Sequence, residues 1–194
     1  MKVLLISAAL LFLVQYASAT QMSGFAAVYY QDDRTTPEES TNAPLFPAII
    51  HGKKTIRMEV SRLSDITSIP VEKDSSAHWT CLHDDDGTNY WFISDNEMGA
   101  GLLTALAISK DGSHKECAKT TEHVSVSVAN IPLLNASHGN LVKWFGKSEI
   151  AKQKAVLFYH ETPVKNGFIQ SNTVSYYFDG EKVRGVIIGQ ITSN

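Results

Sequence analysis

Apolar and polar side chains alternate along several short stretches of this chain. The clearest alternation covers residues 55–61 and 122–130, where apolar side chains occupy every second position. A period of two places successive side chains on opposite faces of an extended backbone, so each stretch predicts a half-buried β-strand. Further stretches rich in aromatic and β-branched residues are also predicted strands: 23–31, 155–160, 167–177 and 182–191.

Residues 78–94 predict a β-hairpin. The stretch holds two of the three tryptophans and has the run Asp-Asp-Asp-Gly at its centre, residues 84–87. Asp-Gly tolerates the positive φ of a tight turn, so the run suits the connection between two antiparallel strands. We therefore expect strands with an aromatic face and a turn with an acidic tip. Asp-Gly pairs at 111–112 and 179–180 predict two further turns.

Residues 99–109 fit either a strand or a helix. Leu102 and Leu106 lie on one face in both structures, and periodicity does not separate the two for a short apolar run. The turn predicted at 111–112 favours a strand, followed by a second hairpin that returns through residues 114–119.

The expected helix content is low. Residues 141–154 have the spacing of a short amphipathic helix, weakened by Gly146. In the predicted strand 182–191, Gly185 and Gly189 indicate bulges or a close approach by an aromatic side chain. About eight strands and recurring turns predict a mainly β protein, an antiparallel β-sandwich or barrel with one short helix and a single disulfide.

The start of the chain has a different pattern. Lys2 precedes an apolar run at residues 3–14, and the small residues Ala-Ser-Ala follow at 17–19. This order is typical of a secretory signal peptide, and the run is too short to cross a hydrocarbon core of about 30 Å as a helix. We expect residues 1–19 to be a signal peptide, residues 20–194 to form one β-rich domain, and the protein to be secreted.

Composition limits the partners of a secreted protein of this kind. The two cysteines of an exported chain predict one disulfide, Cys81–Cys117. Asn135 begins an Asn-Ala-Ser sequon, which predicts a glycosylated surface position if the source is eukaryotic. A formal net charge of −3 argues against nucleic acid as the main partner. Without a second apolar run of spanning length, membrane insertion is not expected.

Candidate catalytic residues come from one assumption about strand pairing. If the two cysteines lie on neighbouring antiparallel strands, Asp84 faces His114 and His83 lies beside that pair. A His–Asp pair can hold a metal or orient a general base. The acidic turn at 84–86 lacks the spacing of a calcium loop, so we expect a solvated turn, no metal and no cofactor. Sequence signatures of nucleophilic serines, zinc helices and phosphate loops are absent.

The aromatic residues of the predicted hairpin are the candidate ligand-binding residues: Trp79, Tyr90, Trp91 and Phe92. They either fill a two-layer core or expose one face to a ligand. Without catalytic motifs, the sequence favours a secreted, non-catalytic binding protein that engages an extracellular protein, a glycan or a small ligand. An extracellular metal-assisted or acid–base hydrolase using His83, Asp84 and His114 is the alternative. A membrane-active protein that inserts residues 99–109 is a third.

Overall fold

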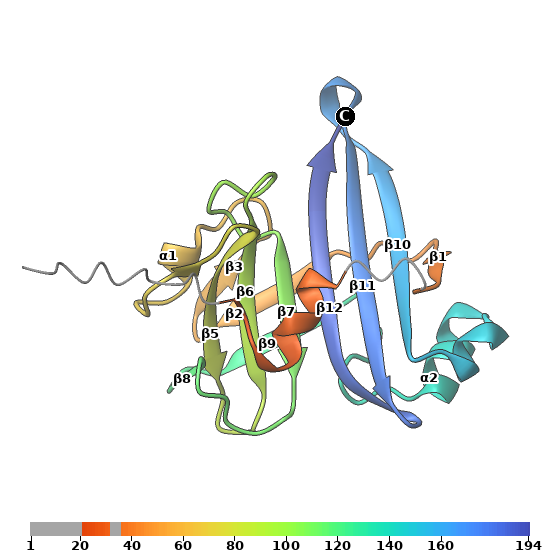
Figure 1. Cartoon of the computed structure of the whole chain (residues 1–194). Helices are drawn as coiled ribbons and strands as arrows, with labels where there is room; N and C mark the ends of the chain where they lie inside the picture. Colours follow the sequence, from red (N-terminus) through yellow and green to blue (C-terminus); the bar gives the residue numbers. More distant parts are fainter. Residues whose placement is uncertain (1–20, 32–35) are drawn as a thin grey trace, which may run out of the picture.

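A computed structural model describes residues 21–31 and 36–194, so the predicted signal peptide, residues 1–19, lies outside the described residues. The described part is mainly β, with two sheets in a sandwich-like arrangement, as Figure 1 shows. The larger sheet has nine strands in the order β1-β10-β11-β12-β7-β6-β5-β4, with β8 paired to β5, and the smaller has the order β3-β2-β9. The predicted mainly β fold with one disulfide is confirmed.

The larger sheet contains β1 (Glu38–Ser40), β4 (Glu72–Lys73), β5 (Ala77–His83), β6 (Asn89–Asp95), β7 (Ala105–Ser109), β8 (Ala118–Lys119), β10 (Ala155–Pro163), β11 (Ile169–Asp179) and β12 (Lys182–Ser193). The smaller sheet contains β2 (Pro47–His51), β3 (Lys54–Ile56) and β9 (Val124–Val128). The helical segments of the described residues are η1 (Gly24–Tyr30), α1 (Leu63–Ile66), α2 (His138–Phe145), η2 (Ser148–Lys152) and η3 (Lys165–Gly167).

The predicted hairpin at 78–94 is confirmed as the antiparallel pair β5 and β6. Cys81 lies opposite Trp91 in this pair. The turn between the strands closes where the Gly87 N–H donates to the Asp84 carbonyl oxygen at 3.0 Å. Gly87 has a φ of +87°, a value that glycine adopts without steric cost and that the Asp-Gly signal predicted.

The Cys81–Cys117 disulfide is confirmed, with 4.4 Å between the two Cα atoms. The predicted second hairpin through 114–119 is wrong, because β8 pairs with β5 and runs parallel to it. The strand β7 instead lies between β6 and β12, and it is buried along its whole length. Because β6 and β12 occupy both hydrogen-bonding edges of β7, residues 114–119 cannot pair with β7, and part of them pairs with β5 instead.

The predicted strand at 23–31 is also wrong. These residues form the 3-10 helix η1, which buries Phe25 and Ala26 against the larger sheet. At 55–61 only the start is a strand, β3, because Glu59 has a φ of +57° and turns the chain.

The predicted helix begins earlier than residue 141. Ser137 caps α2, since its Oγ accepts from the Asn140 N–H and the Asn140 side chain accepts from the Ser137 N–H. Gly146 ends α2 in the left-handed region, with a φ of +69°. In residues 99–109 the second half is a strand, β7, as favoured by the sequence.

The core has two layers separated by the larger sheet. One layer contains Tyr90 and Phe92 together with residues of the smaller sheet and α2. The other contains Trp79 and Trp91, covered by η1 through Phe25. Neighbouring aromatic residues of β6 therefore fill opposite layers, as expected for the alternation of a β-strand.

Candidate functional site

A cleft of about 360 Å³ opens beside the turn of the β5–β6 hairpin. Tyr90, Ile108 and Val126 line it with apolar surface, together with the loop 131–135 that leads from β9 to α2. Ala129 and Asn130 both have a positive φ at the start of that loop, which is uncommon for residues with a side chain. We call this hollow the tip cleft. Its lining combines apolar side chains with polar and charged ones in comparable measure, so it suits an amphipathic molecule.

Charged groups of both signs lie at one end of the tip cleft. Lys110 Nζ lies 3.7 Å from Asp86 Oδ2, and both side chains are about half exposed. Burial by itself would raise the pKa of the Asp86 carboxyl. Hydrogen bonds from Thr88, the positive charge of Lys110 and the electrostatic contribution of His123 outweigh burial and lower this pKa below its usual 3.8. Asp86 is therefore ionised at neutral pH.

Tyr90 brings a neutral hydroxyl to the apolar lining. Burial, followed by the negative charges of Asp86 and Asp84, raises the pKa of Tyr90 to about 12. Its O–H donates to the Val124 carbonyl oxygen at 3.1 Å. The phenol therefore stays protonated and anchors β6 to β9 beneath the tip cleft.

Asp84 and His123 form an acid–imidazole pair near the polar end of the tip cleft. His123 Nδ1 lies 2.7 Å from Asp84 Oδ2. The Asp84 carboxylate is buried and also accepts from the Val124 N–H at 3.1 Å and from the Asp85 N–H at 2.7 Å. His123 is 69% exposed. Because Nδ1 donates to the carboxylate, Nε2 is the basic nitrogen of the neutral ring.

The structure gives the three predicted catalytic residues separate partners. Asp84 pairs with His123, which the sequence analysis did not select, and not with His114. His83 Nδ1 lies 2.8 Å from Asn89 Oδ1. Among the described residues, no hydrogen bond or ion pair joins His83, Asp84 and His114. The assumed antiparallel register was wrong because β8 runs parallel to β5.

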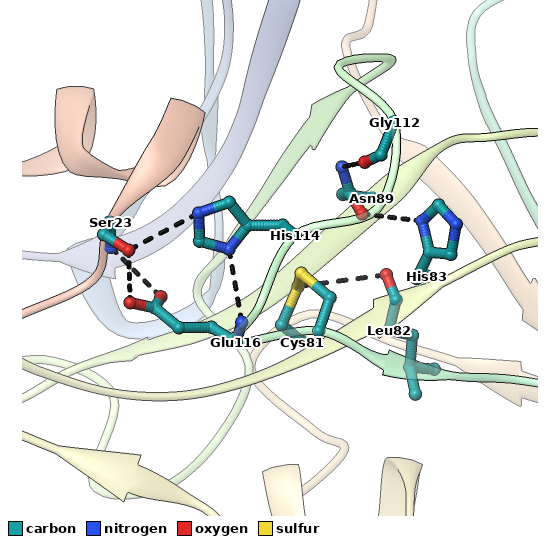
Figure 2. Close-up of a disulfide and its surroundings, with 9 residues drawn as sticks. Ser23, Cys81, Leu82, His83, Asn89, Gly112, His114 and Glu116 are labelled. Atoms are coloured by element: carbon teal, nitrogen blue, oxygen red, sulfur yellow. Dashed lines mark hydrogen bonds between the residues drawn. A yellow bond between two sulfur atoms is a disulfide. The ribbon is translucent and has the colours of Figure 1, made fainter.

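Figure 2 shows where His114 lies, beside the disulfide and the first described residues. Ser23 Oγ donates to the Glu116 carboxylate and lies 3.4 Å from His114 Nε2. The Glu116 N–H donates to His114 Nδ1 at 3.4 Å, so Nδ1 is the acceptor and Nε2 carries the proton. In a nucleophilic relay the serine donates to a basic histidine nitrogen, and the histidine donates to the carboxylate. Here Ser23 donates to the carboxylate directly and the histidine nitrogen that faces it carries a proton, so the three groups do not form such a relay. This cluster fastens the segment before η1.

The four candidate ligand-binding aromatics are buried in the core. Trp79, Trp91 and Phe92 are at most 2% exposed, so they form no exposed platform for a glycan. Tyr90 is the one that lines the tip cleft. Asn135 lies on the surface at the rim of the same cleft.

The described residues offer neither a clustered metal site nor a membrane-spanning helix. In residues 21–31 and 36–194, no group of three or more His, Cys, Asp and Glu side chains could hold a metal ion. Across the same residues, no helix combines the length and the apolar character needed to cross a membrane.

Comparison with protein-family models, with characterised proteins and with solved structures finds no match to this chain.

Proposed function

We propose that this protein is a secreted, non-catalytic binding protein that takes a small amphipathic ligand in the tip cleft. The observation that carries the proposal is the mixed composition of that cleft, in which apolar side chains lie beside the charged groups of Asp86 and Lys110. The Cys81–Cys117 disulfide supports the secreted part, since disulfides persist in oxidising compartments.

The tip cleft sets the chemical class of the ligand. Ile108 and Val126 would contact an apolar body, while Asp86 and Lys110 would bind a polar or zwitterionic head. A volume of about 360 Å³ lies at the lower end of the range for small-molecule sites, roughly 300–1,000 Å³. The size therefore favours a compact organic molecule over a long acyl chain.

A matched pair of variants on β9 tests this proposal. Ser127 lines the tip cleft, whereas Ser125 is exposed on the same strand and does not line it. We expect small amphipathic molecules that raise the melting temperature of the wild type to do the same for Ser125→Phe and to lose the effect on Ser127→Phe. A screen that yields no such molecule, or hits that stabilise both variants equally, would contradict binding in the tip cleft.

The Asp84–His123 pair supports a second candidate, acid–base hydrolysis. A buried carboxylate that orients an exposed imidazole is the arrangement of a general base. No serine or cysteine of the described residues hydrogen-bonds to His123, so the ring would activate water. This pair replaces the predicted set of His83, Asp84 and His114.

Hydrolysis of activated esters tests the second candidate. We expect His123→Ala to lower the rate by about 10²–10⁴-fold, the usual contribution of a general base. His83→Ala is the control because His83 pairs with Asn89 instead. Equal rates for wild type and His123→Ala would exclude this role.

A further inference from the structure

A second hollow, of about 490 Å³, lies between α2 and the loop before it. Pro132, Asn135, Asn140, Lys143 and Trp144 line it. Figure 1 places α2 beside the outer strands β10 and β1 of the larger sheet. We call this hollow the Trp144 hollow, and it brings the sequon asparagine and an aromatic ring together.

Trp144 is 48% exposed, whereas the other two tryptophans are 2% and 1% exposed. The rotation of α2 explains its position. Leu141 is buried in the core and Phe145 stacks on Phe158, with ring centroids 3.5 Å apart. Trp144 lies at the edge of this buried stripe, so its ring is half covered and half open to solvent. The open half of the indole is apolar surface available to a further group.

Asn135 is positioned to place a covalent group in the Trp144 hollow. It is exposed, and its side chain makes no hydrogen bond with the described part of the chain. Ser137, the third residue of its sequon, is the capping residue of α2. The cap fixes where α2 begins relative to Asn135. It therefore also fixes the position of Asn135 relative to Trp144, which lies near the end of α2.

We propose that Asn135 carries an N-linked glycan whose first N-acetylglucosamine stacks on Trp144. The sugar ring has an apolar C–H face that suits an indole. Its hydroxyl and acetamide groups need polar partners, which the Asn140 amide and the Lys143 ammonium supply in the same hollow. Secretion is the only part of the proposed function that this requires. Asn135 also borders the tip cleft, so the test reads the contact at Trp144, which does not line that cleft.

The covalent step needs a lipid-linked oligosaccharide donor. Asn135 Nδ2 forms the bond to the anomeric carbon of the first sugar and loses one proton. The bond from that carbon to the lipid pyrophosphate breaks, and the pyrophosphate leaves with the bonding electron pair. No oxidation or reduction takes place.

Acrylamide quenching of tryptophan fluorescence tests the contact, because Trp144 is the one accessible tryptophan. The full chain is secreted from a eukaryotic host, and the occupancy of Asn135 is measured by peptide mass spectrometry. The wild type is compared with Asn135→Gln and with wild type trimmed enzymatically to a single N-acetylglucosamine. We expect strong quenching for Asn135→Gln and weak quenching for the wild type in both the intact and the trimmed form.

Three control variants separate stacking from other effects. Ser137→Thr keeps both the sequon and the capping hydroxyl, so it should behave as the wild type. Trp144→Leu in the Asn135→Gln chain should remove the quenchable emission. Asp111→Asn creates a new sequon with Gly112 and Ser113 in an exposed turn, and in the Asn135→Gln chain it should leave Trp144 quenchable.

Three outcomes would overturn the proposal. An unmodified Asn135 in the secreted chain would remove the glycan. Equal quenching of glycosylated wild type and Asn135→Gln would remove the contact. Protection of Trp144 by the glycan introduced at Asp111 would show general shielding and not stacking.

Discussion

Asp84 shows how one carboxylate in an acidic turn differs from its neighbours. Asp85 and Asp86 are exposed and pair with Lys119 and Lys110. Asp84 is buried and accepts from two backbone N–H groups and from His123. A buried carboxylate is tolerated when its lone pairs are satisfied, so hydrogen bonding and not solvation holds Asp84 in place.

Replacing Asp84 should therefore be costly. Asp84→Ala leaves the N–H groups of Val124 and Asp85 without their acceptor, and we expect a loss of about 1–3 kcal/mol in the free energy of unfolding. Asp85→Ala removes an exposed ion pair with Lys119 and should change the free energy by less than about 0.5 kcal/mol. Urea denaturation of both variants measures the difference. Equal effects would mean that the buried hydrogen bonds contribute little.

Tyr176 should make the free energy of unfolding depend on pH in the alkaline range. Burial raises the pKa of its hydroxyl well above the usual 10.0, and the hydroxyl donates to the Pro132 carbonyl oxygen at 3.0 Å. The folded state then holds this proton more tightly than the unfolded state. The resulting stability is complete below pH 10 and is lost as the pH rises beyond it, by up to about 1.4 kcal/mol per pH unit.

Urea unfolding from about pH 9 to about pH 12 measures this dependence. Tyr90 also contributes, because its pKa is raised to about 12. The variant Tyr176→Phe removes one of the titrating hydroxyls, so its stability should fall less steeply with pH than that of the wild type. Parallel curves for the two proteins would show that Tyr176 is not protected in the folded state.

At the scale of elements, η1 depends on a glycine far along the chain. The Phe25 ring occupies the position that a Cβ atom of Gly185 would take. The ring also makes an edge contact with Tyr177, with 5.5 Å between ring centroids. A glycine inside this strand predicted a bulge or a close approach by an aromatic side chain, and the approach of Phe25 to Gly185 is confirmed.

Filling that position should displace η1. Gly185→Ala forces Phe25 off the sheet, and we expect a loss of about 1–3 kcal/mol, typical of overpacking. Gly139→Ala in α2 is the control, because its nearest neighbour is 3.9 Å away and alanine suits a helix. In a Phe25→Ala background the cost of Gly185→Ala should shrink. An unchanged cost would show that the strand itself, and not the ring, rejects the methyl group.

At the scale of the whole molecule, Glu59 joins the turn after β3 to the far end of β12. Its carboxylate accepts from the Thr192 N–H at 2.6 Å, from the Thr192 hydroxyl at 2.8 Å and from the Gln190 side chain at 3.1 Å. Its own N–H donates to the Leu103 carbonyl oxygen at 2.7 Å. The positive φ of Glu59 is the backbone geometry that accompanies these contacts.

Neutralising Glu59 should loosen this end of β12. Glu59→Gln keeps the size and the backbone strain but removes the charge, and we expect a loss of about 1.5–3 kcal/mol, the range for hydrogen bonds to charged groups. Hydrogen exchange at the Thr192 N–H should accelerate. Glu161→Gln is the control, because Glu161 makes one exposed contact with Ser171. Unchanged exchange at Thr192 would contradict a joining role.

The sequence by itself determined the local features of this protein. The hairpin at 78–94 follows from Asp-Gly turn chemistry between aromatic stretches, β9 follows from side-chain alternation, and β12 follows from a run rich in β-branched residues. The disulfide follows from the presence of two cysteines. These signals depend on residues within a few positions of one another or on a count, so they survive without knowledge of the fold.

Only the tertiary structure decided the candidate sites. The parallel pairing of β8 with β5 moves His114 away from the assumed register and lets His123 reach Asp84. The tip cleft and the packing of Phe25 against Gly185 also join segments that are distant in the sequence. Such contacts arise from how buried surfaces pack together, and neither periodicity nor composition within a short window encodes which distant segments will meet.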